Sequence, residues 1–333
     1  MQALQITGYG EIKNNVAFAE VERPIIKDHQ VLIEIHSAAI NPIDYKIIEG
    51  HLKAVIKLKF PAPIGFDVAG IVVEKGSKVK HLNVGDEVFS RVPTDAPGTI
   101  AEFIAVDSAV VSLKPSNLSF SEAASLPLVG LTTIQSFDKV GLKAGDKVLI
   151  HAGSGGIGTF ATQYAKSKGA YVYTTTSTKN VGWVKALGAD SVIDYKTENY
   201  LDIVKNIDIV YETLGGAYTA DAFKVIKNGG KVVSLAGDID DETAKELGLN
   251  GLIRFILSLK RRKITKLAKQ KSAQYKYLAM QANGEQLKDI KTLVEANLIK
   301  PVIDKTFDFS DAIDALVYQQ SERAKGKVVI KMK

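Results

Sequence analysis

Residues 148–158 constrain the fold of this chain more than any other segment. They read Val-Leu-Ile-His-Ala-Gly-Ser-Gly-Gly-Ile-Gly, an apolar run followed by a glycine-rich loop. In Gly-x-Gly-x-x-Gly spacing, the first glycine makes a tight turn, the second lets backbone N–H groups approach a pyrophosphate, and the third lets a helix pack closely on the strand. The start of that helix then faces the diphosphate charge. The loop is therefore predicted to bind a dinucleotide through Gly153, Ser154, Gly155, Gly156, Ile157 and Gly158.

Strand-like and helix-like segments alternate from about Ser119 onwards. Apolar runs that suit strands alternate with longer segments that suit helices. The expected strands are residues 147–150, 171–175, 207–211, 231–235 and 275–280, and the expected helices are residues 157–168, 181–187, 217–226 and 285–296. This alternation predicts an α/β domain with a doubly wound parallel sheet, the Rossmann arrangement.

The first 120 residues have a different character. Val31, Ile33 and Ile35 alternate with other residues in the period of a strand, and Asn41-Pro42 ends that run. Further short apolar runs occur between turn residues, which favours a compact β-rich domain. The tail returns to β character at residues 301–304 and 327–331, around a helix at 310–319. We therefore expect a first domain of residues 1–122 completed by 287–333, and a second domain of residues 123–286.

The chain of 333 residues contains no cysteine, which excludes disulfides and thiolate ligands to zinc. Its five histidines show no metal-binding spacing, so no metal site is predicted. The first residues, Met1 to Ile6, lack the pattern of a signal peptide, and no apolar run reaches the ~18 residues of a membrane span. We expect a cytoplasmic protein.

The net charge of +6 comes from one segment. Residues 254–271 contain eight Lys and Arg and no acidic residue, so the rest of the chain carries −2. Leucine, isoleucine and phenylalanine recur in this segment at the spacing of an amphipathic helix. A solvated helix face is the favoured interpretation, ahead of a subunit contact or a cover over an anionic cofactor. A nucleic-acid or membrane partner is not expected.

The residues after the second expected strand indicate which dinucleotide binds. Proteins that bind NAD usually place Asp or Glu about 20 residues after the first glycine, to hold the ribose 2′-hydroxyl. This chain has no acidic residue between Gly158 and Ala189, and residues 174–179 read Thr-Thr-Thr-Ser-Thr-Lys. Hydroxyls and a lysine suit a 2′-phosphate, which a carboxylate would repel. NADPH is therefore the predicted cofactor.

Short motifs that follow one another along the chain in the same order as in a known family support a resemblance to it. The chain resembles the medium-chain dehydrogenase/reductase superfamily, in its zinc-free quinone oxidoreductase and enone (alkenal/one) reductase branch. The resemblance covers nearly the whole chain and rests on residues 41–46, 65–70, 84–88, 98–103, 130–133, the glycine loop, 187–190, 229–233 and 326–329. It implies a GroES-like β-rich domain that carries the substrate pocket, a Rossmann domain, and a cofactor cleft between them. It also implies a homodimer.

The resemblance implies roles for individual residues. Asn41 and Tyr45 would lie beside the nicotinamide and substrate, with Lys46 nearby, although Asn41 also suits a turn before Pro42. Tyr45 is the best candidate for a proton donor or carbonyl contact, with solvent or a packing role as the alternatives. The remaining cofactor contacts would be Thr132 at the nicotinamide ribose, Leu235, Ala236 and Gly237 along the nicotinamide, and Ser177, Lys179, Tyr195 and Arg323 at the 2′-phosphate.

Departures from the zinc-dependent branch bear on the chemistry. That branch has Gly-His-Glu where this chain has Gly65-Phe66-Asp67, so Phe66 replaces a metal ligand. Without a Lewis acid nothing stabilises an alkoxide, whereas an electron-poor alkene or quinone is already electrophilic. The resemblance therefore implies reduction of small enones, alkenals or quinones. The alternatives are an enoyl-thioester reductase of the same fold and a nucleotide-binding protein with little catalysis.

Overall fold

The computed structural model describes residues 1–53 and 56–333, which form two compact units. The first unit contains Met1–Leu131 and Gln281–Lys333, and the second contains Thr132–Met280. The expected borders lay at 122/123 and 286/287. The division in the structure falls instead within helix α4 (Pro127–Val140) and just before helix α12 (Gly284–Glu295). Helix α12 belongs to the first unit because Gly284 packs closely against the backbone of Ala109 and Val111.

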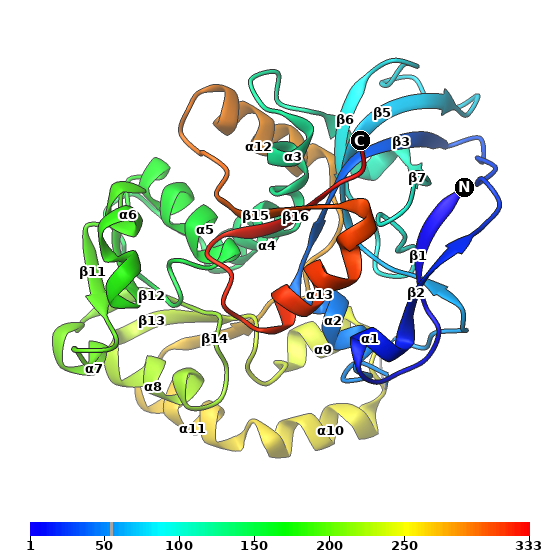
Figure 1. Ribbon diagram of the computed structural model, residues 1–333. Coiled ribbons are helices and arrows are strands. Elements are labelled where there is room, and N and C mark those ends of the chain that lie inside the picture. Colours follow the sequence, from blue (N-terminus) through cyan, green and yellow to red (C-terminus); the bar gives the residue numbers. More distant parts are fainter. Residues whose placement is uncertain (54–55) are drawn as a thin grey trace. The chain divides into compact units, whose positions relative to one another are not determined.

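The first unit is built on two sheets (Figure 1). The three-stranded sheet has the order β2 (Val16–Glu20), β1 (Gln2–Ile6), β4 (Ala62–Pro63). The larger sheet has the order β15 (Ile303–Asp308), β16 (Lys327–Lys331), β3 (Gln30–Ile40), β5 (Asp67–Lys75), β6 (Glu87–Arg91), β8 (Val111–Leu113), and β7 (Phe103–Asp107) also pairs with β3. Strand β16 pairs with β3 antiparallel, so the tail of the chain completes the sheet of the first unit.

The first unit also contains short helices that the sequence analysis did not anticipate. The unit contains α1 (Ile12–Asn15), α2 (Pro42–Ile48), α3 (Phe120–Ala124), α12 and α13 (Ala312–Gln320). Asn41-Pro42 ends strand β3 as expected, but the same residues also begin helix α2. Asn41 is the N-cap, Pro42 is the first helical residue, and the Asp44 carboxylate accepts the Asn41 N–H at 2.7 Å. From the sequence, Asn41-Pro42 was predicted only to end a strand, and helix α2 was not anticipated.

The second unit contains a six-stranded sheet in which all strands are parallel. Its order is β11 (Ser191–Asp194), β10 (Tyr171–Thr176), β9 (Lys147–Ile150), β12 (Ile207–Glu212), β13 (Ile226–Ser234), β14 (Gln274–Tyr277). Numbered along the unit this order is 3-2-1-4-5-6, that of a dinucleotide-binding sheet. The helices of the unit are the rest of α4, α5 (Gly156–Ser167), α6 (Val181–Ala186), α7 (Tyr200–Ile203), α8 (Ala217–Val225), α9 (Asp241–Glu246), α10 (Gly251–Lys260) and α11 (Arg262–Gln270). The predicted doubly wound fold is confirmed.

The basic segment forms the two helices α10 and α11. The expected amphipathic burial holds for α11, which buries Ile264 and Ala268. It does not hold for α10, in which no residue is buried and Leu252 is 71% exposed. No helix among the described residues is long and apolar enough to cross a membrane.

Candidate functional site

The predicted glycine loop joins β9 to α5 in the second unit. Strand β9 ends at Ile150, Ala152 adopts a positive φ of 55°, and Gly155 is the N-cap of α5. The N–H of Gly153 donates to the carbonyl of Thr175 on β10 at 2.8 Å, which fixes the loop against the neighbouring strand. No side chain caps α5. The N-terminus of this twelve-residue helix is therefore left for an anion.

The three glycines of the motif differ in what surrounds them. A Cβ on Gly153 would overlap the Thr174 side chain, and a Cβ on Gly158 would overlap the Ala152 carbonyl oxygen. A Cβ on Gly155 would have one neighbour within 4 Å, at 3.4 Å. Gly153 and Gly158 are thus required by close packing, whereas Gly155 leaves open space beside the loop. This open space is what a bound pyrophosphate needs.

Two of the residues predicted at the 2′-phosphate follow adjacent strands. Thr176, the last residue of β10, pairs with Asp194, the last residue of β11, so Ser177 and Tyr195 come next on each. The Tyr195 N–H donates to the Thr176 carbonyl at 3.0 Å. The Tyr195 side chain is 54% exposed, and Lys179 is exposed in the same stretch after β10. The second unit therefore brings Ser177 and Tyr195 together, with Lys179 two residues beyond Ser177.

Asp194 is a carboxylate in this region that the sequence analysis did not consider. A hydrogen bond from the Thr178 side chain and one from the Lys196 N–H lower its pKa. The Lys196 N–H lies 3.0 Å from the carboxylate. Asp194 is thus ionised and held by its own turn.

The segment Leu235, Ala236 and Gly237 directly follows β13, as expected. Its backbone is held by Ser234, whose Oγ accepts the N–H of Gly237 at 2.8 Å and donates to the carboxylate of Glu212 at 2.6 Å. Glu212 is fully buried and also accepts the Thr219 hydroxyl at 2.9 Å. Glu212 and Ser234 therefore shape this segment, and no local sequence pattern had indicated either residue.

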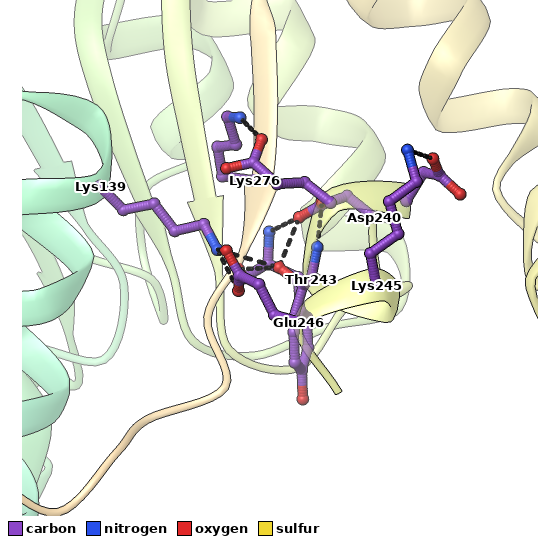
Figure 2. Close-up of polar contacts among 9 residues, drawn as sticks. Lys139, Asp240, Thr243, Lys245, Glu246 and Lys276 are labelled. Carbon is purple, nitrogen blue, oxygen red and sulfur yellow. Dashed lines mark hydrogen bonds and ion pairs between the residues drawn. The ribbon is translucent and has the colours of Figure 1, made fainter. Parts of the chain in front are cut away.

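The chain beyond Gly237 is anchored around Asp240, the N-cap of α9 (Figure 2). Burial opposes ionisation of Asp240, but N–H donors from Tyr277 and Thr243 outweigh it and lower the pKa. Lys139 of α4 donates to the Thr243 hydroxyl at 3.0 Å and pairs with Glu246 at 3.0 Å. These contacts hold the chain beyond residues 235–237, while Ser234 holds it on the preceding side.

The predicted catalytic residues lie on or beside α2 in the first unit. Tyr45 is 5% exposed, and its hydroxyl donates to the Glu322 carboxylate at 3.1 Å. Burial and this contact raise the pKa of Tyr45 to about 12, so its proton is retained at neutral pH. Lys46 is exposed on the same helix. Arg323 follows Glu322 and is exposed. It belongs to the first unit, whereas the other residues predicted at the 2′-phosphate belong to the second.

Asn41 is almost fully buried, and both polar atoms of its carboxamide have partners. Its Nδ2 donates to Asp67 at 2.9 Å, and its Oδ1 accepts a hydrogen bond from Lys327. Lys327 also pairs with Asp67 at 3.1 Å. Thr132, in α4 at the start of the second unit, is buried as well, with 6% of its surface exposed. A direct substrate contact by Asn41 stays a prediction, and the structure gives its side chain protein partners.

Two family models match the chain. One is described as "Alcohol dehydrogenase GroES-like domain" and matches residues 27–116, and the other as "Zinc-binding dehydrogenase" and matches residues 187–330. The 2-methylene-furan-3-one reductase of Solanum lycopersicum is 37% identical over 340 residues, which cover 99% of this chain and 79% of that protein. The chain belongs to the medium-chain dehydrogenase/reductase superfamily, in its zinc-free quinone and enone reductase branch.

Other relatives agree with this assignment. The chloroplastic NADPH-dependent alkenal/one oxidoreductase of Arabidopsis thaliana is 34% identical, with 99% of this chain and 79% of that protein covered. The structure of the quinone oxidoreductase from Coxiella burnetii is 33% identical, with a TM-score of 0.85 and coverage of 100% of this chain and 99% of that one. The predicted resemblance and its fold are confirmed.

The name of one family model raises the question of whether zinc suits this reductase. Phe66, at the position of a metal ligand in the zinc branch, is buried, and the Arg91 guanidinium lies 4.9 Å from its ring centre. Each oxygen of the neighbouring Asp67 already accepts a hydrogen bond. Within residues 1–53 and 56–333, no group of three or more His, Asp or Glu is placed to hold a metal ion. The residues present do not suit zinc.

His151, beside the glycine loop, is fully buried. Its ring packs edge-on against Tyr200 and Tyr218, with ring centres 5.3 Å apart in both cases. Burial lowers the pKa of His151 to about 4, so the ring is neutral at physiological pH. His151 is therefore a packed core residue directly after strand β9.

Proposed function

We propose that this chain is an NADPH-dependent reductase that transfers hydride to the C=C bond of enones and alkenals, or to quinones, without a metal. The observation that carries the proposal is the uncapped glycine loop on a 3-2-1-4-5-6 parallel sheet. The names of the relatives, which include an NADPH-dependent alkenal/one oxidoreductase, support the substrate class.

The residues of the second unit suit NADPH. The loop from Gly153 to Gly158 would hold the pyrophosphate, because Gly155 leaves room and the α5 N–H groups attract negative charge. Ser177, Lys179 and Tyr195 would hold the 2′-phosphate, and Arg323 is a further proposed contact. Leu235, Ala236 and Gly237 would lie along the nicotinamide, with Thr132 at its ribose.

The chemistry divides between the cofactor and the chain. Bound NADPH supplies the hydride, and the chain orients the acceptor and stabilises the charge that develops on its oxygen. Tyr45 is proposed as the hydrogen-bond donor to that oxygen, which requires its hydroxyl to exchange the bond to the Glu322 carboxylate for one to the acceptor. Lys46 adds a positive charge on the same helix. Asn41 is proposed to hold the start of this helix in place.

An NADPH oxidation assay with three acceptors tests the proposal. The acceptors are 9,10-phenanthrenequinone, a short 2-alkenal and a crotonyl thioester. We expect turnover with the quinone or the alkenal. Preference for the thioester would support the enoyl-thioester alternative, and tight NADPH binding without turnover would indicate a nucleotide-binding protein. Faster turnover with NADH would contradict the choice of cofactor.

The assembly and location of the protein also belong to this proposal. We propose a homodimer that acts in the cytoplasm on small molecules, with no nucleic-acid or membrane partner. The family resemblance supports the dimer, and the confinement of the excess positive charge to α10 and α11 argues against a broad nucleic-acid surface. Analytical ultracentrifugation would test the dimer through the molecular mass in solution. Fractionation of source cells would test the location.

A further inference from the structure

We infer that the buried ion pair between Asp67 and Lys327 is a positioning device for catalysis, which acts through Asn41 on helix α2. The inference rests on the proposed function, because it assigns Tyr45 and Lys46 of α2 to the reaction. Of the residues proposed to contact the substrate, Asp67 and Lys327 touch only Asn41 in the contacts given above. Both are therefore positioning residues.

The pair joins four segments that are far apart in the sequence. Asp67 begins β5, and its Oδ2 accepts from Asn41 and from Lys327 of β16. Its Oδ1 accepts the N–H of Leu128, in the first turn of α4, at 2.9 Å. The side chains of Asp67 and Lys327 are 0% and 6% exposed. Charges this deeply buried are tolerated only when they are paired and well hydrogen-bonded, as these are.

The contacts fix one orientation of the Asn41 carboxamide. Its oxygen faces the Lys327 ammonium, and its nitrogen faces the Asp67 carboxylate. A flip of the amide would place N–H groups against the ammonium and the oxygen against the carboxylate. Both contacts would then be repulsive, so the pair permits only one rotamer.

Asn41 transmits this constraint to α2. It is the N-cap residue, and its own N–H is held by Asp44 one turn into the helix. The position of Asn41 therefore determines where α2 begins and the direction in which it leaves β3. Tyr45 is four residues further on, with its hydroxyl on Glu322. A small movement of Asn41 would displace Tyr45 relative to an acceptor.

A double variant that removes both charges separates positioning from stability. Asp67→Asn with Lys327→Met removes both charges of the pair together, and such replacements are often neutral for stability. The buried Arg91, whose charge Asp67 also favours, keeps its hydrogen bonds to Val92 and Thr94 in this variant. We expect the purified full-length variant to fold and to bind NADPH within about twofold of wild type. We expect its kcat to fall by about 10- to 100-fold, as for a small misplacement of reacting groups. The control neutralises the Lys114–Glu87 pair of the same unit, in which Lys114 is buried and Glu87 is half-exposed, as Lys114→Met with Glu87→Gln.

A mutant cycle with Asn41→Ala tests the route of the effect. In wild type this substitution should lower kcat, and in the double variant it should add little, because the pair acts through Asn41. Independent, additive losses would overturn the inference. If the double variant does not fold, Lys327→Arg keeps the charge but moves the donors. It should then fold with a similarly reduced kcat, and a wild-type kcat would overturn the inference.

Hydrogen exchange gives a readout that does not depend on turnover. Amides of residues 43–50 should exchange faster in the double variant than in wild type, while those of the second unit should not change. Unchanged exchange at residues 43–50, or a wild-type kcat in the double variant, contradicts the inference and leaves the proposed function intact. Wild-type enzyme that reduces none of the three acceptors contradicts the proposed function, and exchange then decides on the positioning of α2.

Discussion

Lys179 is exposed just beyond β10, and the stretch from Gly158 to Ala189 contains no acidic residue. If Lys179 contacts the 2′-phosphate, Lys179→Glu replaces an attraction with a repulsion. We expect the KM for NADPH to rise by at least about tenfold, equivalent to about 1.4 kcal/mol, and the KM for NADH to change little. Steady-state kinetics with both cofactors measures this, and equal effects on the two would show that Lys179 does not contact the phosphate.

Asp44 provides a prediction about pH. Burial raises the pKa of its carboxyl to about 7, well above the ordinary 3.8. The folded state therefore holds this proton more tightly than the unfolded state. The contribution of the protonated carboxyl to the free energy of unfolding is fully present below about pH 4 and is lost as the pH rises to about 7. Asp44→Asn removes this loss. The free energy of unfolding of the variant, relative to that of wild type, should therefore increase by on the order of 2–4 kcal/mol between about pH 4 and about pH 7.

Thermal unfolding of both proteins from pH 4 to pH 8 measures the effect of Asp44→Asn. The difference in Tm should increase up to about pH 7 and then level off. A difference that is constant across the range would mean that Asp44 does not titrate there.

The junction of β9 and α5 is an element whose geometry depends on one glycine. A Cβ on Gly158 would overlap the Ala152 carbonyl and the Gly153 Cα, so Gly158→Ala must push α5 away from β9. We expect a destabilisation of about 1–3 kcal/mol and a large loss of NADPH affinity. Gly182→Ala in α6 is the control, since a Cβ there meets nothing within 4 Å. The control should be stabilised by up to about 1 kcal/mol, with NADPH affinity unchanged in a fluorescence titration.

Elements that depend on local pattern were predictable, and those that depend on distant partners were not. The strands and helices around the glycine loop match the structure, because a strand, a glycine turn and a helix are encoded within one short segment. Strand β11 was missed because only Val192 and Ile193 in it are apolar, whereas the equally short β9 is apolar from Val148 to Ile150. Helix α2 was missed because Asn41-Pro42 suits both the end of a strand and the start of a helix.

The same distinction applies to the candidate site. The residues predicted to contact the cofactor lie in or beside recognisable motifs, and their roles stay predictions. Asp67 and Lys327 lie within quoted motifs too, but 260 residues separate them. Nothing in either motif indicates that they pair or that Asn41 lies between them. Glu322 and Glu212 were missed for the same reason, because only the fold brings their partners to them.

For the molecule as a whole, we predict that activity survives exhaustive chelation. The chain has no cysteine, Phe66 occupies the position of a metal ligand, and the Asp67 oxygens are engaged by Leu128, Asn41 and Lys327. Turnover after prolonged dialysis against EDTA should equal that of untreated enzyme. A loss that added zinc restores would contradict the metal-free mechanism.

The position of β16 has a consequence for biosynthesis. The strand lies between β3 and β15 in the sheet of the first unit, and it carries the only cation paired with Asp67 in the ion pairs of the described residues. While a ribosome is still translating the region before Lys327, the nascent first unit lacks an edge of its sheet and the ion-pair partner of Asp67. The second unit is one continuous stretch. Domains of a growing chain usually fold in the order of their synthesis. In this chain the unit that begins to emerge first is the last to receive all the strands of its sheet.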